Sequence, residues 1–348
     1  MAFIRPSTIL RLYFVFVSVA LLWMFFSYGV WCPEMPRKSR TDTSKLTMAQ
    51  RENMLLEKEA ALSRMADNLY KLERQLQQQY PLQFAQAKSL SLIDMPLLYI
   101  ITPTHTRPEQ KAELTRLSQT LLHVPRLHWI VVEDNDKKTK LVENFVANCG
   151  LTFTHLAVKT PPDFKMKTTD PNWLKPRGVL QRNLALKWVR NTLKFSHESS
   201  VLYFADDDNT YDLRIFKEMR STSKVSVWPV GIVGGLLFER PLVEDGKVVA
   251  WYTYWKPQRP FAMDMAGFAV NTKLLMKYPH AEFSLKVPRG YQESVLLKQL
   301  VRLEELEPKA DNCSKILVWH TRTEKPSLKN ELRLKQKGRP VSDPNIEV

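Results

Sequence analysis

Three consecutive carboxylates, Asp206, Asp207 and Asp208, stand directly after an apolar run at residues 201–205. Such a run, rich in β-branched and aromatic residues, is typical of a buried strand. In open α/β sheets, ligands bind beyond the carboxyl ends of the strands. Adjacent negative charges repel one another, and a divalent cation bound by oxygen ligands relieves the repulsion. The stretch therefore predicts a Mg²⁺ or Mn²⁺ site whose shell is completed by water and substrate phosphates.

The same stretch has a second interpretation, an acidic turn that begins the next helix. In that case Asp208 or Asn209 would serve as the N-cap. Short aspartate clusters are common in turns, so spacing alone does not decide between an ion site and a cap.

Alternating strands and helices lead up to the aspartates. Apolar runs predict strands at 97–102, 127–132 and 152–156, and helices at 109–122, 141–148 and 178–193. This alternation is typical of a mostly parallel sheet with helices on both faces. Asp134 follows the second strand, so we expect it at the same sheet edge as the three aspartates.

The second half of the chain has a different pattern. Strands are expected at 225–233, 236–239, 247–254 and 316–319, and a helix at 293–302. Asp245 and Gly246 predict a hairpin turn between two of these strands. The pattern indicates a mixed, more antiparallel region. A polar tail from Lys325 onward is expected to be loosely ordered until residues 343–348.

Composition limits the class of protein. The 348 residues are 44% hydrophobic, which is enough for one large domain or two smaller ones with appendages. A net charge of +15 favours anionic partners such as nucleotides, anionic sugars or membrane surfaces. No zinc, helix-turn-helix or aromatic–basic signature supports nucleic acid as a partner. The three cysteines make no disulfide framework, and Cys32 is the candidate for a bond between two chains.

An uncharged stretch dominated by large apolar residues runs from Leu12 to Trp31. It is long enough to cross a bilayer as one helix, and its bulky end lacks the small residues of a signal-peptide cleavage site. We therefore expect a cytoplasmic tail at 1–11, a retained signal anchor at 12–31 and a translocated domain behind it. Basic residues flank both ends, so the positive-inside rule does not set the orientation.

Residues 32–95 are expected to form a stem rich in Lys, Glu, Gln and Ser. Large apolar residues recur in it every seven positions, at Met48, Leu55, Leu62, Leu69 and Leu76, with Met65 and Leu72 on the intervening seam. This heptad pattern predicts a helix that pairs in parallel with a second copy, although Lys58 and Gln79 interrupt the seam. A single amphipathic helix packed on its own domain is the alternative.

Several longer motifs resemble one family. FADDDNTY, VSVWPVGIVGG, RPFAMDMAGFAV, and LVWHTRTEKP with the terminal SDPNIEV are similar to the β-1,3-glucuronosyltransferases, metal-dependent inverting enzymes of the Golgi. The resemblance covers residues from about Leu97 to Val348 and is strongest to the branch that acts on the galactose–galactose–xylose linker of proteoglycans. It implies an α/β nucleotide-sugar-binding fold of the GT-A type. The nucleotide-sugar subdomain would span 96–211 and a mixed-sheet acceptor subdomain 212–348.

The resemblance also implies donor-binding residues. Asp208 would hold Mn²⁺, which acts as a Lewis acid on the departing UDP. Asp207 would bind the ribose, with Asp206 beside it. Asp134 and His105 would contact the uracil, and His105 replaces the tyrosine that is usual in this family, so less stacking area is available. The remaining donor contacts expected from the family are Arg177, Arg182, His320 and Arg322.

Glu293, in RGYQES, corresponds to the family's general base, which takes the proton from the attacking acceptor hydroxyl. Without the resemblance it would be interpreted as an ordinary carboxylate in the first turn of a helix. Inversion with an oxocarbenium-like transition state requires no covalent intermediate. Glu239, Arg259 and Asp264 correspond to acceptor-sugar contacts, and Trp255 offers an aromatic face to a galactose ring.

The resemblance as a whole implies a single-pass type II Golgi membrane enzyme with a lumenal catalytic domain. It would act as a homodimer and transfer glucuronic acid from UDP-glucuronate to the 3-hydroxyl of a terminal galactose in glycosaminoglycan biosynthesis. Asn312 begins an Asn-Cys-Ser glycosylation acceptor. Three alternatives remain: a transferase with another donor or another galactose-ended acceptor, a metal phosphohydrolase, and an inactive sugar-binding Golgi protein.

Overall fold

The computed structural model describes residues 95–348 except 167–169, 171–173, 195–198 and 344–345, together with scattered residues between 54 and 68. The chain divides into two compact units, residues 1–85 and 86–348. The described residues of the first unit are helical and exposed, and they include the seam positions Lys58 and Met65. The expected anchor at 12–31, Cys32 and the other heptad positions lie outside the described residues. Within the described part, no helix is both long enough and apolar enough to span a bilayer.

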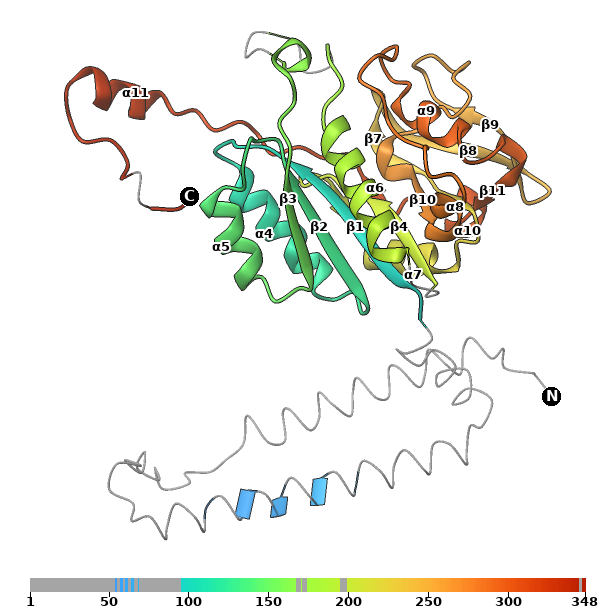
Figure 1. The fold of residues 1–348 in the computed structure, drawn as a ribbon, viewed down its shortest axis with the longest axis horizontal. Coiled ribbons are helices and arrows are strands. Elements are labelled where there is room, and N and C mark those ends of the chain that lie inside the picture. The colour runs from blue at the N-terminus through green and yellow to red at the C-terminus, as the bar shows by residue number, and fades with distance from the viewer. Residues whose placement is uncertain are drawn as a thin grey trace, which may run out of the picture. The chain divides into compact units, whose positions relative to one another are not determined.

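The larger sheet of the second unit has seven strands in the order β11-β6-β10-β4-β1-β2-β3 (Figure 1). Their bounds are β1 Leu97–Thr104, β2 Leu127–Glu133, β3 Phe153–Ala157, β4 Ser200–Phe204, β6 Val225–Val227, β10 Phe268–Asn271 and β11 Leu306–Pro308. Strands β1 to β4 are parallel to their neighbours among themselves, and β10 runs antiparallel to both β4 and β6. The mostly parallel sheet expected from the alternating pattern is confirmed.

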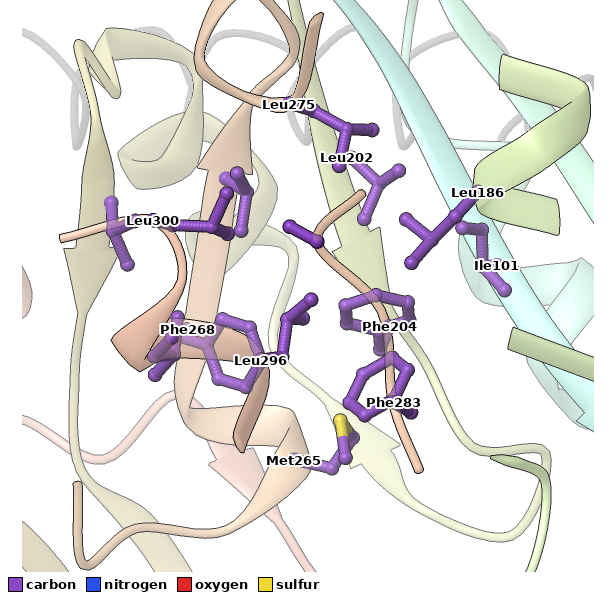
Figure 2. Packing of buried hydrophobic residues seen from close by; sticks show 14 of the residues in the cluster. Ile101, Leu186, Leu202, Phe204, Met265, Phe268, Leu275, Phe283, Leu296 and Leu300 are labelled. Atoms are coloured by element: carbon purple, nitrogen blue, oxygen red, sulfur yellow. The ribbon is translucent and has the colours of Figure 1, made fainter. Parts of the chain in front are cut away.

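Helices cover both faces of this sheet and form one apolar core on each face. Strand β1 contributes side chains to both cores. Leu98 and Ile100 belong to a core that includes residues of α4 Gln110–Leu121, α5 Lys140–Asn148 and α7 Leu213–Glu218. Tyr99 and Ile101 point to the opposite face, where α6 Val179–Leu193, α8 Thr272–Lys277 and α9 Gln292–Lys298 contribute. Alternating side chains of one buried strand therefore feed two apolar layers. Figure 2 shows the second core, in which Phe204, Phe268 and Phe283 pack beside Leu296.

The smaller sheet has five strands in the order β5-β12-β7-β8-β9. Their bounds are β5 Thr210–Tyr211, β7 Val230–Val233, β8 Leu236–Glu244, β9 Lys247–Tyr252 and β12 Val318–Trp319. Short 3₁₀ turns lie at Pro162–Phe164, Met219–Ser221, Met265–Gly267 and Leu303–Glu305. The hairpin predicted at Asp245 and Gly246 joins β8 to β9, and both residues have the positive φ that a tight hairpin turn requires. The mixed character expected for this half is confirmed.

The prediction of one strand over residues 225–233 is wrong. Strand β6 pairs with β10 and β11 in the larger sheet, whereas β7 pairs with β8 and β12 in the smaller one. Trp228 and Pro229 separate them, and proline has no N–H to continue a ladder. Trp228 instead donates from Nε1 to the carbonyl of Ala266 at 2.8 Å. Strands from both sides of residue 211 thus share the larger sheet, and the proposed subdomain division at that residue stays a prediction.

The end of the chain also differs from expectation. The tail expected to be loosely ordered contains α11 Lys329–Gln336, extends away from the sheets and returns toward α5 (Figure 1). Its end is held where Lys111 Nζ donates to the Glu347 carbonyl at 2.8 Å.

Helix α9 ends at Lys298 rather than at residue 302, because 3₁₀-type bonds such as Leu300 N to Leu297 O close it early. Asn312 is exposed on the short turn α10, Ala310–Cys313, whose four residues all have positive φ.

Candidate active site

The carboxyl ends of three parallel strands place the predicted acidic residues at one edge of the larger sheet. Strand β4 ends at Phe204, and the Ala205 amide still donates to the Ile101 carbonyl of β1 at 2.9 Å. The aspartates follow immediately. After β2, the Asp134 amide donates to the Thr104 carbonyl at 2.8 Å. The expectation that these carboxylates share one edge is therefore confirmed.

The three aspartates are held in three different ways. Asp206 forms an ion pair with Arg182 of α6 at 2.6 Å. Asp207 is buried, pairs with Arg107 at 2.7 Å and accepts a hydrogen bond from Thr104 Oγ1 at 2.7 Å. Burial raises the pKa of Asp207 to about 6, and Arg107 opposes that rise. Asp206 and Asp207 are thus neutralised within the protein.

Asp208 differs from its neighbours because its carboxylate accepts no hydrogen bond or ion pair from any described residue, whereas its backbone carbonyl accepts from Thr321 Oγ1 at 2.6 Å. Burial raises the pKa of Asp208, and the nearby Asp206 adds to the rise. Glu113 adds to that rise, and His320 and Arg107 oppose it. A half-buried carboxylate that no described residue pairs with is a suitable ligand for a divalent cation. No three His, Cys, Asp or Glu side chains of the described residues form a complete metal site, so water and ligand oxygens would supply the other positions.

The residues expected around the uracil meet at the same edge. Asp134 accepts a hydrogen bond from the Thr160 amide at 2.7 Å, which fixes its carboxylate. Desolvation first, and then the guanidinium groups of Arg107 and Arg177, lower the pKa of His105, while Asp134 opposes them. His105, Asp134 and Arg177 are therefore close enough to influence one another. A neutral imidazole beside a fixed carboxylate is suited to a flat, uncharged base.

Helix α6 supplies Arg182 from its first turn. Gly178, the N-cap, has φ 71, and a Cβ on it would lie 2.6 Å from Arg182 Nη1. Arg182 Nη1 donates to the Arg177 carbonyl at 2.9 Å while Nη2 pairs with Asp206. Arg182 consequently fixes the loop before α6 against the aspartate cluster.

Glu293 lies in the first turn of α9. The adjacent Ser294 hydroxyl donates to the Phe261 carbonyl at 3.0 Å and so holds this turn against the segment that carries Arg259 and Asp264. Burial raises the pKa of Glu293 to about 7, Asp264 adds to the rise, and Arg259 and Arg182 oppose it. The structure thus brings Glu293 together with residues of both the acceptor and the donor sets. A carboxyl group whose pKa is near neutrality can act as a general base.

Arg259 and Asp264 are close enough to Glu293 to influence its pKa, and the other two expected acceptor residues have contacts of their own. Arg259 is buried and donates to the Gly290 carbonyl at 2.8 Å. Glu239 is hydrogen-bonded to the Thr253 hydroxyl, and burial raises its pKa. The Trp255 ring is flanked by cations, with Lys256 Nζ at 4.7 Å and Arg259 Cζ at 5.4 Å from its centroid. These contacts hold the indole ring in one orientation.

An open pocket of about 630 Å³ joins the acceptor and donor sets. It is lined by Ile232, Val233, Gly234, Gly235, Asp264, His320, Thr321 and Arg322. His320 Nδ1 lies 3.6 Å from Asp264 Oδ2, and Arg322 Nη2 lies 3.3 Å from His320 Nε2. His320 and Arg322 thus face a space large enough for a sugar, and Thr321 between them binds the Asp208 backbone.

Sequence reasoning missed the residues that support the aspartates. Thr104, Arg107 and Glu113 form a buried polar network with Asp207. Thr104 and Arg107 belong to the TPTHTR stretch after the first strand, so their position at the sheet edge was a usable signal. Glu113 falls within a predicted helix, and nothing local distinguishes it from a solvent-exposed helix carboxylate.

Gly290 provides a test of how tightly Trp255 is held. Its φ is +76, and an added Cβ would lie 2.1 Å from Trp255 Cζ3. We expect Gly290→Ala to displace the indole, to change the tryptophan fluorescence and to destabilise the fold by roughly 2–4 kcal/mol, from overpacking and from a left-handed alanine. Thermal unfolding measures the loss. Gly235→Ala is the matched control, because its φ is +77 and nothing lies within 4 Å of its added Cβ. Equal losses in the two variants would contradict the clash with Trp255.

An α/β domain that gathers aspartates at strand ends, places basic side chains beside them and adds a sugar-sized pocket and a buried carboxyl group of raised pKa has the organisation of a glycosyltransferase. The chain belongs to glycosyltransferase family 43, whose sequence model matches residues 117–324.

Curated proteins similar to this chain carry consistent names. Galactosylgalactosylxylosylprotein 3-beta-glucuronosyltransferase 1 of Homo sapiens is 55% identical over 257 residues, which cover 73% of this chain and 75% of that protein. Galactosylgalactosylxylosylprotein 3-beta-glucuronosyltransferase 3 of Mus musculus is 54% identical over 263 residues, 73% of this chain and 78% of that protein. Among solved structures, S. aureus TarS 1-349 in complex with UDP-GlcNAc matches with a TM-score of 0.42 and 17% identity, over 66% of this chain and 59% of that chain.

Proposed function

We propose that this enzyme transfers glucuronic acid from UDP-glucuronate to the 3-hydroxyl of a terminal galactose, with inversion, in the linkage region of proteoglycans. The names of the curated relatives, at 53–55% identity, support this reaction. The observation that carries it is the position of Glu293, whose raised pKa suits a general base, among Asp264, Arg259 and Arg182. The fold is assigned to the GT-A type on the strength of the aspartates at the end of β4.

The donor half of the site is proposed to bind UDP along the sheet edge. Asp134 and His105 would contact the uracil, and Asp207, kept ionised by Arg107, would accept hydrogen bonds from the ribose hydroxyls. Arg182, Arg322, Arg177 and His320 would bind the diphosphate and the glucuronate. An Arg fork suits both a carboxylate and a phosphate, which supports a donor with an acidic sugar.

Asp208 fits a divalent cation, because its carboxylate has no hydrogen-bond or ion-pair partner among the described residues and the carboxylates of Asp206 and Glu113 lie near it. Bound there, Mn²⁺ would neutralise the charge that develops on the leaving diphosphate. Thr321 fixes the Asp208 backbone, so the carboxylate is held at a defined position between β4 and the pocket.

The acceptor half is proposed to present a galactose to Glu293. Trp255 offers its face to the apolar side of the ring, while Glu239, Arg259 and Asp264 would bind hydroxyl groups. Glu293 in its ionised form accepts the proton of the attacking 3-hydroxyl. The new bond forms on the face opposite UDP, so the configuration inverts without a covalent intermediate.

The pH dependence of the rate follows from the ionisation of Glu293, which must be deprotonated to act as the general base. Because the pKa of Glu293 is raised to about 7, its ionised form is lost as the pH falls through that value. We expect kcat/KM to fall roughly tenfold per pH unit below neutrality and to level off above it. A rate profile at saturating Mn²⁺ measures this. A profile that stays flat down to about pH 5 would contradict the role of a raised-pKa base.

The N-terminal region is proposed to be a type II signal anchor followed by a stem, which would place the catalytic domain in the Golgi lumen. The uncharged stretch at 12–31 and the exposed glycosylation acceptor at Asn312 support this topology. Loss of a glycan mass in an Asn312→Gln variant tests it. A homodimer is also proposed. Its two copies would contact each other through the stem, through a Cys32 disulfide, or through the C-terminal tail reaching the partner's acceptor site. Mass measurement with and without the stem tests this proposal.

One assay tests the proposed reaction. The enzyme is incubated with UDP-glucuronate and either a digalactosyl or a lactosamine acceptor, and a panel of other UDP-sugars replaces the donor. We expect transfer from UDP-glucuronate to the digalactosyl acceptor to dominate. Preference for the lactosamine acceptor would indicate an enzyme that acts on other glycans, carried by glycoproteins or glycolipids. Phosphate release without an acceptor would indicate a hydrolase, and no turnover would indicate an inactive sugar-binding protein.

A further inference from the structure

Arg107 lies between β1 and α4 and has no assigned role in the reaction above. Its side chain is only 16% exposed. One terminal nitrogen, Nη2, pairs with Asp207 Oδ2 at 2.7 Å and also with the Glu113 carboxylate. The other, Nη1, donates to the His105 carbonyl at 3.0 Å and lies 3.2 Å from His105 Nδ1. One guanidinium group thus contacts three residues from three elements.

These contacts join the two sides of the nucleoside site. His105 belongs to the segment expected at the uracil, whereas Asp207 follows β4 and is expected at the ribose. Asp207 and Glu113 are 6% and 3% exposed, so solvent cannot hold either carboxylate in place. A planar fork with several N–H donors can serve a carboxylate and a carbonyl together, which a lysine ammonium on a flexible stem does less well.

We propose that Arg107 is a positioning residue that fixes the uracil-side segment and the ribose-side carboxylate as one rigid unit. This inference rests on the proposed function. A preorganised nucleoside site lowers the entropic cost of binding UDP. Arg107 should therefore determine donor affinity, seen as KM for UDP-glucuronate. It should have little influence on kcat at saturating donor, because its hydrogen bonds and ion pairs with described residues are to Asp207, Glu113 and His105 and not to Glu293.

A purely structural role, neutralising Glu113, is the competing explanation and requires its own variant. Arg107→Gln leaves Glu113 buried without its cation, so lost stability could mimic lost positioning. In the double variant Arg107→Gln/Glu113→Gln, the unpaired Glu113 charge is removed and two amides can hydrogen-bond. Thermal stability should then recover in part, because Asp207 still lacks its cation, while the contacts with Asp207 and the His105 carbonyl remain weakened. The control Arg214→Gln removes an exposed pair with Asp212 on α7.

The experiment measures UDP affinity by calorimetry with Mn²⁺, the melting temperature, and KM and kcat for UDP-glucuronate in each full-length variant. We expect Arg107→Gln and the double variant both to bind UDP roughly 10- to 100-fold more weakly, with kcat within about threefold of the parent. Arg107→Lys should be intermediate, and Glu113→Gln and Arg214→Gln should bind UDP within about threefold of the parent.

Three results would overturn the inference. The double variant could bind UDP as tightly as the parent, Glu113→Gln alone could lose as much affinity as Arg107→Gln, or kcat could fall while KM stays unchanged. Failure of the parent enzyme to bind UDP would instead contradict the proposed function, so the two failures are distinguishable.

Discussion

Replacement of Glu293 by Gln is expected to lower kcat by roughly 10²- to 10⁴-fold, the usual contribution of a positioned general base. Glutamine has the same shape and can hydrogen-bond the acceptor hydroxyl, but it cannot accept its proton. UDP affinity should stay within about threefold, because Glu293 lies on the acceptor side. Single-turnover rates with saturating UDP-glucuronate and a digalactosyl acceptor measure the effect.

The fold should not suffer from this change. Burial disfavours the ionised form of Glu293 in the folded protein, where the pKa of its carboxyl group is about 7. The free energy of unfolding therefore falls as the pH rises from the pKa of the unfolded chain to that value. Glu293→Gln should therefore melt no lower than the parent above neutral pH. Glu282→Gln, an exposed carboxylate in the same part of the fold, is the control and should keep full activity. A Glu293→Gln enzyme with kcat within about threefold of the parent would remove Glu293 from the mechanism.

Asp208→Asn should damage both binding and turnover. The amide has the same shape but no charge, so the divalent cation loses its protein carboxylate. We expect UDP affinity to lose most of its dependence on Mn²⁺ and kcat to fall by roughly 10²- to 10⁴-fold. Titration of UDP with and without Mn²⁺, followed by rates at high Mn²⁺, measures the two effects.

The interpretation of Asp208 or Asn209 as the cap of the next helix is wrong, because α7 begins at Leu213 and its N-cap is Asp212. Stability measurements separate the two roles. The Asp208 carboxylate has no partner among the described residues, so Asp208→Asn should leave the melting temperature unchanged or raise it. Asp212 gives the opposite pattern, because its side chain caps α7 through the Arg214 amide at 2.8 Å. Asp212→Ala should lose about 1 kcal/mol of stability and keep its activity. Full Mn²⁺-dependent activity in Asp208→Asn would exclude Asp208 as the ligand.

The strand-end geometry could be predicted because it depends on local pattern. Buried strands such as β1 and β4 show as short apolar runs, and alternation with helices makes the connections parallel. The polar residues that follow each strand must then meet at one edge. Asp134 and the three aspartates of residues 206–208 were placed correctly by this argument. Pro229 is itself a local signal that residues 225–233 do not form one strand, because proline cannot continue a ladder.

The support of the site could not be predicted, because it depends on pairs that are distant in the sequence. Arg107 meets Asp207 across about a hundred residues, and Arg182 meets Asp206 from another element. The antiparallel strand β10 and the division of β6 and β7 between two sheets also depend on which partners complete each ladder.

Residue types and spacing along the chain were therefore sufficient for the class of fold and for the sheet edge that carries the acidic residues, and the resemblance of the longer motifs indicated the family. The tertiary structure alone decided the electrostatic state of each group. It neutralised Asp206 and Asp207, left Asp208 available for a cation and raised the pKa of Glu293. The physical reason is that hydrogen bonds, ion pairs and desolvation act through space, over a few ångströms, between side chains that the sequence separates.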